Sequence, residues 1–176
     1  METDLRYPIG QFQNVVKMTE AQRLGLIDEI AAAPGNLRAA VAGLTPAQLD
    51  TEYRPGGWTV RQVVHHMPDS HMNAFVRFKL ALTENEPTIK PYDEAGWANL
   101  ADVKATPVEI SFALLDNLHV RWVALLRALT PSDLARKYHH PELGLVSLDD
   151  ALALYAWHGR HHVAHVTSLR ERRAWL

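Results

Sequence analysis

Residues 59–83 read TVRQVVHHMPDSHMNAFVRFKLALT, and this stretch decides the fold. The hydroxyl of Thr59 can accept a hydrogen bond from a free backbone N–H, and Gln62 can answer it, which is the capping box that begins a helix. Pro68 removes one backbone hydrogen bond and predicts a kink. The stretch predicts a long amphipathic helix, because its apolar residues follow a helical spacing: Val60, Val63, Val64, Met67, Phe75, Phe78 and Leu82.

Similar signals along the chain predict three more long helices. We expect them over 20–42, with a kink or a break at Pro34 and Gly35, over 106–128 from a capping box at Thr106, and over 147–173. Short helical turns are expected after Thr45 and Thr130. Four long helices predict an all-α four-helix bundle with extra short helices, forming a single domain over residues 1–176. The segment 136–146 fits either a small hairpin or a plain loop.

The composition narrows the class of protein. The formal net charge is −2, so no basic field is present that would gather nucleic acid or anionic lipid. No apolar run approaches the roughly 20 residues that span a bilayer, and residues 1–10 lack the apolar region of a secretory signal. We therefore expect a cytoplasmic protein. Cysteine is absent, which excludes disulfides and Cys-based metal sites, and any reacting thiol must come from a small molecule.

Histidine is the unusual residue, with ten copies, of which seven lie at 65–71 and 158–165. Residues four apart share a helix face, so the pairs 158/162 and 161/165 can each offer two imidazoles to one metal. Helical phase places His158 and His162 inside the apolar arc of their helix, and His161 and His165 at its edge. Two imidazoles buried together need partners, which favours His158 and His162 as metal ligands over a solvated or core-bonded cluster.

The helix at 59–83 carries further histidines. By phase, His65 points outward, His66 lies on the flank of the apolar stripe, and His71 lies in its centre. Phase alone therefore leaves His66 and His71 open as a third ligand, and each also fits a core histidine bonded to a carbonyl. His139 and His140 are expected at the surface.

Several motifs together resemble the YfiT-like branch of the DinB-like superfamily. They read GGWTVRQVVHHM at 56–67 and DSHMN at 69–73, followed by Tyr155-x-Trp157-His158-x3-His162. Shorter stretches at 7–10, 77–79, 90–94 and 121–122 extend the resemblance over nearly the whole chain. The resemblance implies a DinB-like four-helix bundle, often a homodimer.

The resemblance also implies a ligand set. In the family, three histidines bind one divalent metal, zinc or nickel, and the second histidine of the His-His pair is the first ligand. Here the three are His66, His158 and His162. Members are described as metal-dependent hydrolases, and relatives transfer or use low-molecular-weight thiols such as bacillithiol. This chain departs from the wider pattern at His165, where Gln is typical, and at Pro68, where helix-forming residues are common.

Three neutral imidazoles leave a metal with at least one open position, as in catalytic sites. Such a site can lower the pKa of a bound water from 15.7 to about 7, or deprotonate an external thiol. We therefore expect a metal-dependent hydrolase that acts on a small molecule. The alternatives are an S-transferase that uses a low-molecular-weight thiol, and a non-catalytic metal- or ligand-binding module.

Beyond the ligands, the candidate catalytic residues are Asp69, Asn73 and Arg77. Asp69 can orient a ligand ring, as can Glu142, although Asp69 also fits a solvated carboxylate. Asn73 and Arg77 continue the polar line from His66 and can bind an anionic group, although Arg77 also fits an ordinary ion pair. Three aromatic residues fit either a pocket wall or the core: Tyr92, Trp97 and Tyr138.

Overall fold

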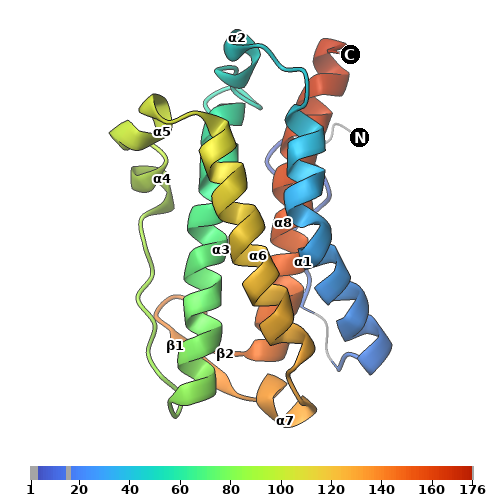
Figure 1. Ribbon diagram of the computed structural model, residues 1–176, viewed down its shortest axis with the longest axis vertical. Coiled ribbons are helices and arrows are strands. Elements are labelled where there is room, and N and C mark those ends of the chain that lie inside the picture. Colours follow the sequence, from blue (N-terminus) through green and yellow to red (C-terminus); the bar gives the residue numbers. More distant parts are fainter. Residues whose placement is uncertain (1–3, 15–16, 176) are drawn as a thin grey trace.

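Four long helices run side by side in the computed structural model, which describes residues 4–14 and 17–175 (Figure 1). Positions 1–3, 15–16 and 176 of the expected domain lie outside the described residues. The long helices are α1 (Glu20–Val41), α3 (Val60–Thr83), α6 (Val108–Arg127) and α8 (Leu148–Arg173). The connections hold α2 (Pro46–Leu49), α4 (Glu94–Trp97), α5 (Ala101–Ala105), α7 (Pro131–Leu134) and the antiparallel hairpin of β1 (Lys137–His140) and β2 (Gly144–Ser147). The predicted bundle is confirmed, and the segment expected at 136–146 as a hairpin or a loop forms a hairpin over 137–147.

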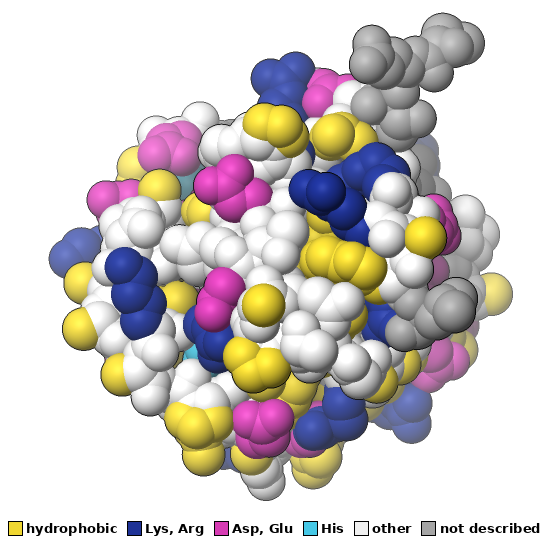
Figure 2. Space-filling view, turned by 90° about the horizontal axis from the view of Figure 1, so that it is seen from above, with side chains coloured by type: hydrophobic (Ala, Val, Ile, Leu, Met, Phe, Trp, Pro, Cys, Tyr) yellow, Lys and Arg dark blue, Asp and Glu magenta, His cyan; other side chains and the backbone are white. Residues whose placement is uncertain are grey.

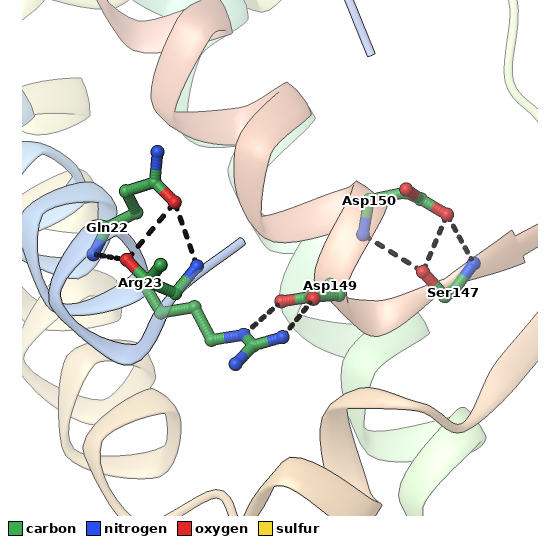
Figure 3. Close-up of polar contacts among 6 residues, drawn as sticks. Gln22, Arg23, Ser147, Asp149 and Asp150 are labelled. Carbon is green, nitrogen blue, oxygen red and sulfur yellow. Dashed lines mark hydrogen bonds and ion pairs between the residues drawn. The ribbon is translucent and has the colours of Figure 1, made fainter. Parts of the chain in front are cut away.

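Capping boxes begin most of these helices. Thr59 and Gln62 form the expected box at α3, and Ser147 and Asp150 form the one at α8, which Figure 3 shows. A further box, at Thr19, begins α1 and was missed in the sequence. Each box satisfies backbone N–H groups that the helix itself leaves free.

The capping box expected at Thr106 is wrong. Helix α6 begins at Val108 behind Pro107, without a side-chain cap. The reason is that Thr106 already ends α5, where its backbone N–H donates to the carbonyl of Asp102. A short helix that the sequence pattern did not reveal therefore fixes the entry to α6.

Two prolines lie inside long helices without breaking them. Helix α1 continues through Pro34, so the helix is not split there, and α3 continues through Pro68. Proline has no N–H, so the carbonyl four residues earlier loses its helical partner. In α1 that carbonyl belongs to Ile30, and it accepts a hydrogen bond from Nδ1 of His119 at 2.7 Å.

Helix α1 packs against α8 and α6, and α3 packs against α6 and α8. Arg23 of α1 and Asp149 of α8 form a bidentate ion pair (Figure 3). Nε and Nη2 of the arginine donate to the two carboxylate oxygens at 2.7 and 2.6 Å. Further along the same pair of helices, Gly159 faces Ala33 so closely that an added Cβ would lie 3.2 Å from the alanine methyl carbon. These contacts hold α1 directly against α8, which carries four of the ten histidines.

Histidines divide the apolar core into two clusters. One cluster includes Phe78, Trp122 and Leu152, and the other includes Val63, Leu115 and Val166. His71, His119, His158 and His162 lie between the two clusters along their helices, and His66 packs against His158 and His162. We call these five residues the histidine layer.

Charged side chains of both signs share the face of the molecule that Figure 2 shows. At the end of the bundle seen in Figure 2, basic and acidic side chains are interspersed and very little histidine is visible. Within residues 4–14 and 17–175, every helix is too short or too polar to cross a bilayer.

Candidate metal centre

His66 of α3 and His158 and His162 of α8 bring their ring nitrogens together inside the bundle. One nitrogen from each ring lies within 4.8 Å of the others. The Nε2 atoms of His66 and His158 are 3.2 Å apart. Nitrogens that share a tetrahedral zinc ion are about 3.3 Å apart, given Zn–N bonds of about 2.0–2.1 Å. Two of the three rings therefore already have the spacing of ligands on one ion.

The sequence explains how the rings are positioned. His158 and His162 are one turn apart and share a face of α8, and α8 packs against α3. Before α3, Gly56 adopts a φ of +65°, which favours glycine, and turns the chain into Trp58. The indole of Trp58 packs on the ring of His66, with centroids 4.6 Å apart, and stacks with His162 at 6.2 Å and 12°.

Burial keeps these imidazoles neutral. Loss of solvent lowers the pKa of His66 to about 4, and it lowers the pKa values of His158 and His162 well below the ordinary range. Neutral imidazole offers a lone pair, and the protonated ring does not. At neutral pH the three rings are therefore in the form that can bind a cation.

The donor set fits a divalent transition metal. Nδ1 of His162 is buried, and no described residue offers it a hydrogen-bond partner. An unpaired buried nitrogen costs about 1–3 kcal/mol, and a bound cation is one partner that would remove this cost. Neutral imidazole is a ligand suited to zinc and nickel.

A pocket of about 380 Å³ opens onto the three rings. Its wall carries two side chains of opposite charge, Arg54 and Glu94, which the sequence reading did not assign to the site. Glu94 belongs to the 90–94 stretch of the family resemblance, and that stretch could have indicated it as a residue of the site. Its full lining is Tyr53, Arg54, Gly56, Gly57, Trp58, His66, Glu94, His158 and His162.

The aromatic candidates take other places. Tyr92 and Trp97 pack on each other with ring centroids 4.5 Å apart, and neither lines the pocket. Tyr138 is 1% exposed and belongs to an apolar cluster. Tyr138 is therefore a core residue and not part of the pocket wall.

His71 lies beside the three rings and contacts one of them. Its Nε2 is 3.1 Å from Nδ1 of His158, and its Nδ1 is 2.8 Å from Nε2 of His119. The sequence reading missed His119. Its signal was a polar residue within the apolar stripe of α6, between Leu115 and Trp122.

Two expectations about exposed histidines are wrong. His65 is buried, and its Nδ1 lies 2.7 Å from the hydroxyl of Ser111, because α6 covers that side of α3. His140 is also buried, because side chains alternate along β1 and those of Tyr138 and His140 face inward. His139 is exposed, as expected.

His161 and His165, placed at the edge of the apolar arc, are covered by the segment before α1. Nε2 of His165 is 3.1 Å from the carbonyl oxygen of Arg6, and the ring of Tyr7 lies 5.9 Å from that of His161. Both histidines are buried. A helical wheel misses this cover, because it comes from a segment without helical periodicity.

The three candidate catalytic residues do not converge on the rings. Asp69 is half-buried, which raises its pKa to about 6, and among the described residues its carboxylate makes no hydrogen bond to the three rings. The Asn73 amide donates to the Asp69 carbonyl at 2.9 Å, and the Arg77 guanidinium donates to the Tyr155 hydroxyl at 3.1 Å. Glu142 is exposed, and its backbone N–H donates to Nδ1 of His140.

The fold and the site together define a class: helical bundles that gather neutral histidines around a candidate metal centre. The chain belongs to the DinB superfamily, whose family model matches residues 29–166. It is 58% identical over 172 residues to a protein of Bacillus mycoides (strain KBAB4) and 57% identical to one of Bacillus cereus (strain B4264). Each match covers 98% of this chain and 99% of the relative, and both relatives bear the name "Putative metal-dependent hydrolase".

Solved structures agree with this assignment. YfiT from Bacillus subtilis, described as a probable metal-dependent hydrolase with an unusual four-helix bundle topology, superposes with a TM-score of 0.95. It is 48% identical, and the match covers 98% of this chain and 99% of YfiT. The four-helix bundle protein TT2238, at 20% identity and a TM-score of 0.58, supports the fold alone. The resemblance to YfiT-like proteins is confirmed.

Proposed function

We propose that this protein is a metal-dependent hydrolase that holds one divalent metal, zinc or nickel, through His66, His158 and His162. The observation that carries the proposal is the convergence of three ring nitrogens within 4.8 Å, from two buried histidines and the half-buried His158. The names of the Bacillus relatives and of YfiT support the same class of activity. The substrate is a small molecule, in keeping with a pocket of about 380 Å³.

The side chains around the centre have separate tasks in this proposal. When bound, a divalent metal lowers the pKa of a coordinated water to about 7. The protein keeps the three rings neutral by burial, and Trp58 packs against two of them. Arg54 on the pocket wall binds a negatively charged part of the substrate, and the Glu94 carboxylate, which also lines the pocket, accepts a proton.

Metal content tests the ligand set directly. Purified protein should hold about one equivalent of zinc or nickel, and His66→Ala, His158→Ala and His162→Ala should each lose it. His139→Ala is the matched control, because His139 is exposed and lies outside the group of three histidines. Wild-type protein without a stoichiometric metal, or full metal content in all three variants, would contradict the proposal.

A thiol S-transferase is the second candidate, and the absence of cysteine agrees with a thiol supplied from outside. One assay separates the two functions. The metal-loaded protein is incubated with an activated p-nitrophenyl ester, with and without a low-molecular-weight thiol. Carboxylic acid formed without thiol supports hydrolysis, and a thioester formed only with thiol supports transfer. Bound metal without either product supports the third hypothesis, which is a non-catalytic metal- or ligand-binding module.

We also propose that the protein is a cytoplasmic homodimer, as the family resemblance implies. Sedimentation of the purified chain would test the assembly. A mass near 19.8 kDa at micromolar concentration would indicate a monomer and contradict this part of the proposal.

A further inference from the structure

A chain of hydrogen bonds crosses the histidine layer from α8 to α1. Nδ1 of His158 lies 3.1 Å from Nε2 of His71, and Nδ1 of His71 lies 2.8 Å from Nε2 of His119. Nδ1 of His119 then lies 2.7 Å from the carbonyl oxygen of Ile30. His71 is 0% exposed and His119 is 3% exposed, so water does not compete at either ring. This chain of hydrogen bonds therefore links His158, a proposed metal ligand, to the backbone of α1.

The carbonyl at the end of the chain decides the direction of every hydrogen bond. A carbonyl oxygen only accepts, so the proton of His119 is on Nδ1 and its Nε2 carries the lone pair. Nδ1 of His71 must then donate to His119, which leaves Nε2 of His71 as an acceptor. Nδ1 of His158 must in turn donate to His71. The remaining nitrogen of His158, Nε2, is left with its lone pair.

Pro34 makes the Ile30 carbonyl available. In an unbroken helix this oxygen would accept from the backbone N–H of residue 34, but proline has none. Helix α1 nevertheless continues through Pro34. The freed oxygen faces His119, which becomes its hydrogen-bond donor. Pro34 in α1 and His119 in α6 together account for the hydrogen bond that ends the chain at the Ile30 carbonyl.

The other end of the chain faces the candidate metal centre. Nε2 of His158 is the atom that lies 3.2 Å from Nε2 of His66, and the Ser70 hydroxyl lies 3.4 Å from it. A hydroxyl can donate to a lone pair, so the contact with Ser70 agrees with the assigned direction. Nε2 of His158, the nitrogen that would bind the metal, therefore carries no proton in the metal-free protein.

We propose that His71 and His119 are positioning residues that fix the tautomer and orientation of His158, so that its Nε2 lone pair is held toward the metal. The inference rests on the proposed function, in which His158 is a ligand. Second partners of ligand histidines commonly contribute a factor of about 10–100 in metal affinity. Here the second partner is a buried histidine, and a third histidine and a carbonyl determine its own tautomer.

Nuclear magnetic resonance on metal-free protein tests the proton positions without any metal. Long-range correlations between ring carbon-bound protons and ring nitrogens distinguish Nδ1–H from Nε2–H tautomers. We expect His71, His119 and His158 all to carry the proton on Nδ1 at neutral pH. An Nε2–H tautomer at His71 or His158 would overturn the inference.

Variants of His119 test the effect on metal binding. His119→Leu removes the acceptor for His71, so we expect His71 to lose its single tautomer and the zinc Kd to rise about 10–100-fold. His119→Gln retains a carbonyl oxygen that can accept from His71, and its zinc Kd should stay within a few-fold of wild type. Trp122→Phe is the packing control, because Trp122 contacts both rings without joining the chain.

The outcomes separate this inference from the proposed function. If wild-type protein binds neither zinc nor nickel stoichiometrically, the proposed function fails, and the role of the hydrogen-bond chain in metal binding fails with it. If wild type binds zinc and His119→Leu binds it equally well, only the positioning role fails. If Trp122→Phe weakens zinc as much as His119→Leu does, packing rather than the hydrogen-bond chain explains the loss, and the inference is rejected.

Discussion

The indole of Trp58 packs on the imidazole of His66 with ring centroids 4.6 Å apart, and it also stacks with His162. A metal held by these two histidines would therefore lie next to this tryptophan. We expect nickel, which quenches nearby fluorophores, to lower the tryptophan fluorescence of the protein. Trp58→Phe should lose most of this quenching while still binding nickel. Trp97→Phe is the control, since Trp97 lies outside the pocket, and equal quenching in both variants would place the metal elsewhere.

The pocket carboxylate gives a kinetic prediction. Glu94→Gln removes a proton acceptor but keeps the size of the side chain, so kcat/KM for p-nitrophenyl ester hydrolysis should fall by a factor of about 10²–10⁴. The metal content should not change, because Glu94 is outside the proposed ligand set. Glu142→Gln, an exposed carboxylate outside the pocket lining, should leave the rate unchanged. A rate loss accompanied by metal loss would mean that Glu94 acts as a ligand.

His119 gives a prediction about stability in acid. Burial lowers its pKa from 6.5 to about 4 in the folded protein, so the fold favours the neutral ring. The unfolded chain takes up a proton below pH 6.5 and the folded one does not, so stability present above pH 6.5 is lost as pH falls toward 4. Between pH 7 and pH 5 this residue should account for a loss of about 2 kcal/mol.

Urea unfolding of chelator-treated protein at the two pH values measures that loss. His119→Gln cannot be protonated, so its stability should fall by about 2 kcal/mol less than that of wild type over the same range. His139→Gln changes an exposed histidine and should behave like wild type. An identical loss in wild type and His119→Gln would show that other groups cause the acid sensitivity.

The helices were predictable because their signals are local. Thr59 with Gln62 and Ser147 with Asp150 determine helix starts within four residues of chain, and the apolar stripe of α3 follows directly. Thr106 failed because it belongs to two elements at once, ending α5 just before α6 begins. A local pattern cannot show which of two competing helices will use a residue.

The histidines were predictable only in part, because their surroundings come from distant segments. Helical phase predicted the pair His158 and His162 as ligands, since an arc on α8 is a property of α8 alone. The burial of His65 depends on α6, and that of His165 depends on the segment near Arg6. The link from His71 to His119 joins residues of two helices, and no spacing within one helix predicts it.

The ion pair between Arg23 and Asp149 gives a stability prediction. Both side chains are about one-fifth exposed, and the carboxylate accepts two hydrogen bonds, so the pair is better shielded than most surface pairs (Figure 3). Asp149→Asn should lower the free energy of unfolding by about 1 kcal/mol. Asp28→Asn is the matched control, because the pair of Asp28 with Arg127 is far more exposed. Equal effects in denaturant unfolding would show that shielding makes no difference.

Gly159 gives a prediction about the distance between α1 and α8. It follows His158 directly, and an added Cβ would lie 3.2 Å from the Cβ of Ala33, next to Pro34. In Gly159→Ala, the helix propensity gain of about 1 kcal/mol opposes the tight contact, so the net change should be small. Gly159→Leu has no room and should destabilise the protein by about 1–3 kcal/mol or more.

The Gly159→Leu variant should also move α1 away from α8 and lengthen the contact between Ile30 and His119. We therefore expect weaker zinc binding in Gly159→Leu than in a variant destabilised to the same degree elsewhere, such as Leu126→Ala. Denaturant unfolding matches the two variants in stability, and zinc titration compares them. Equal zinc affinity in the matched pair would show that the spacing of α1 and α8 matters for the fold and not for the centre.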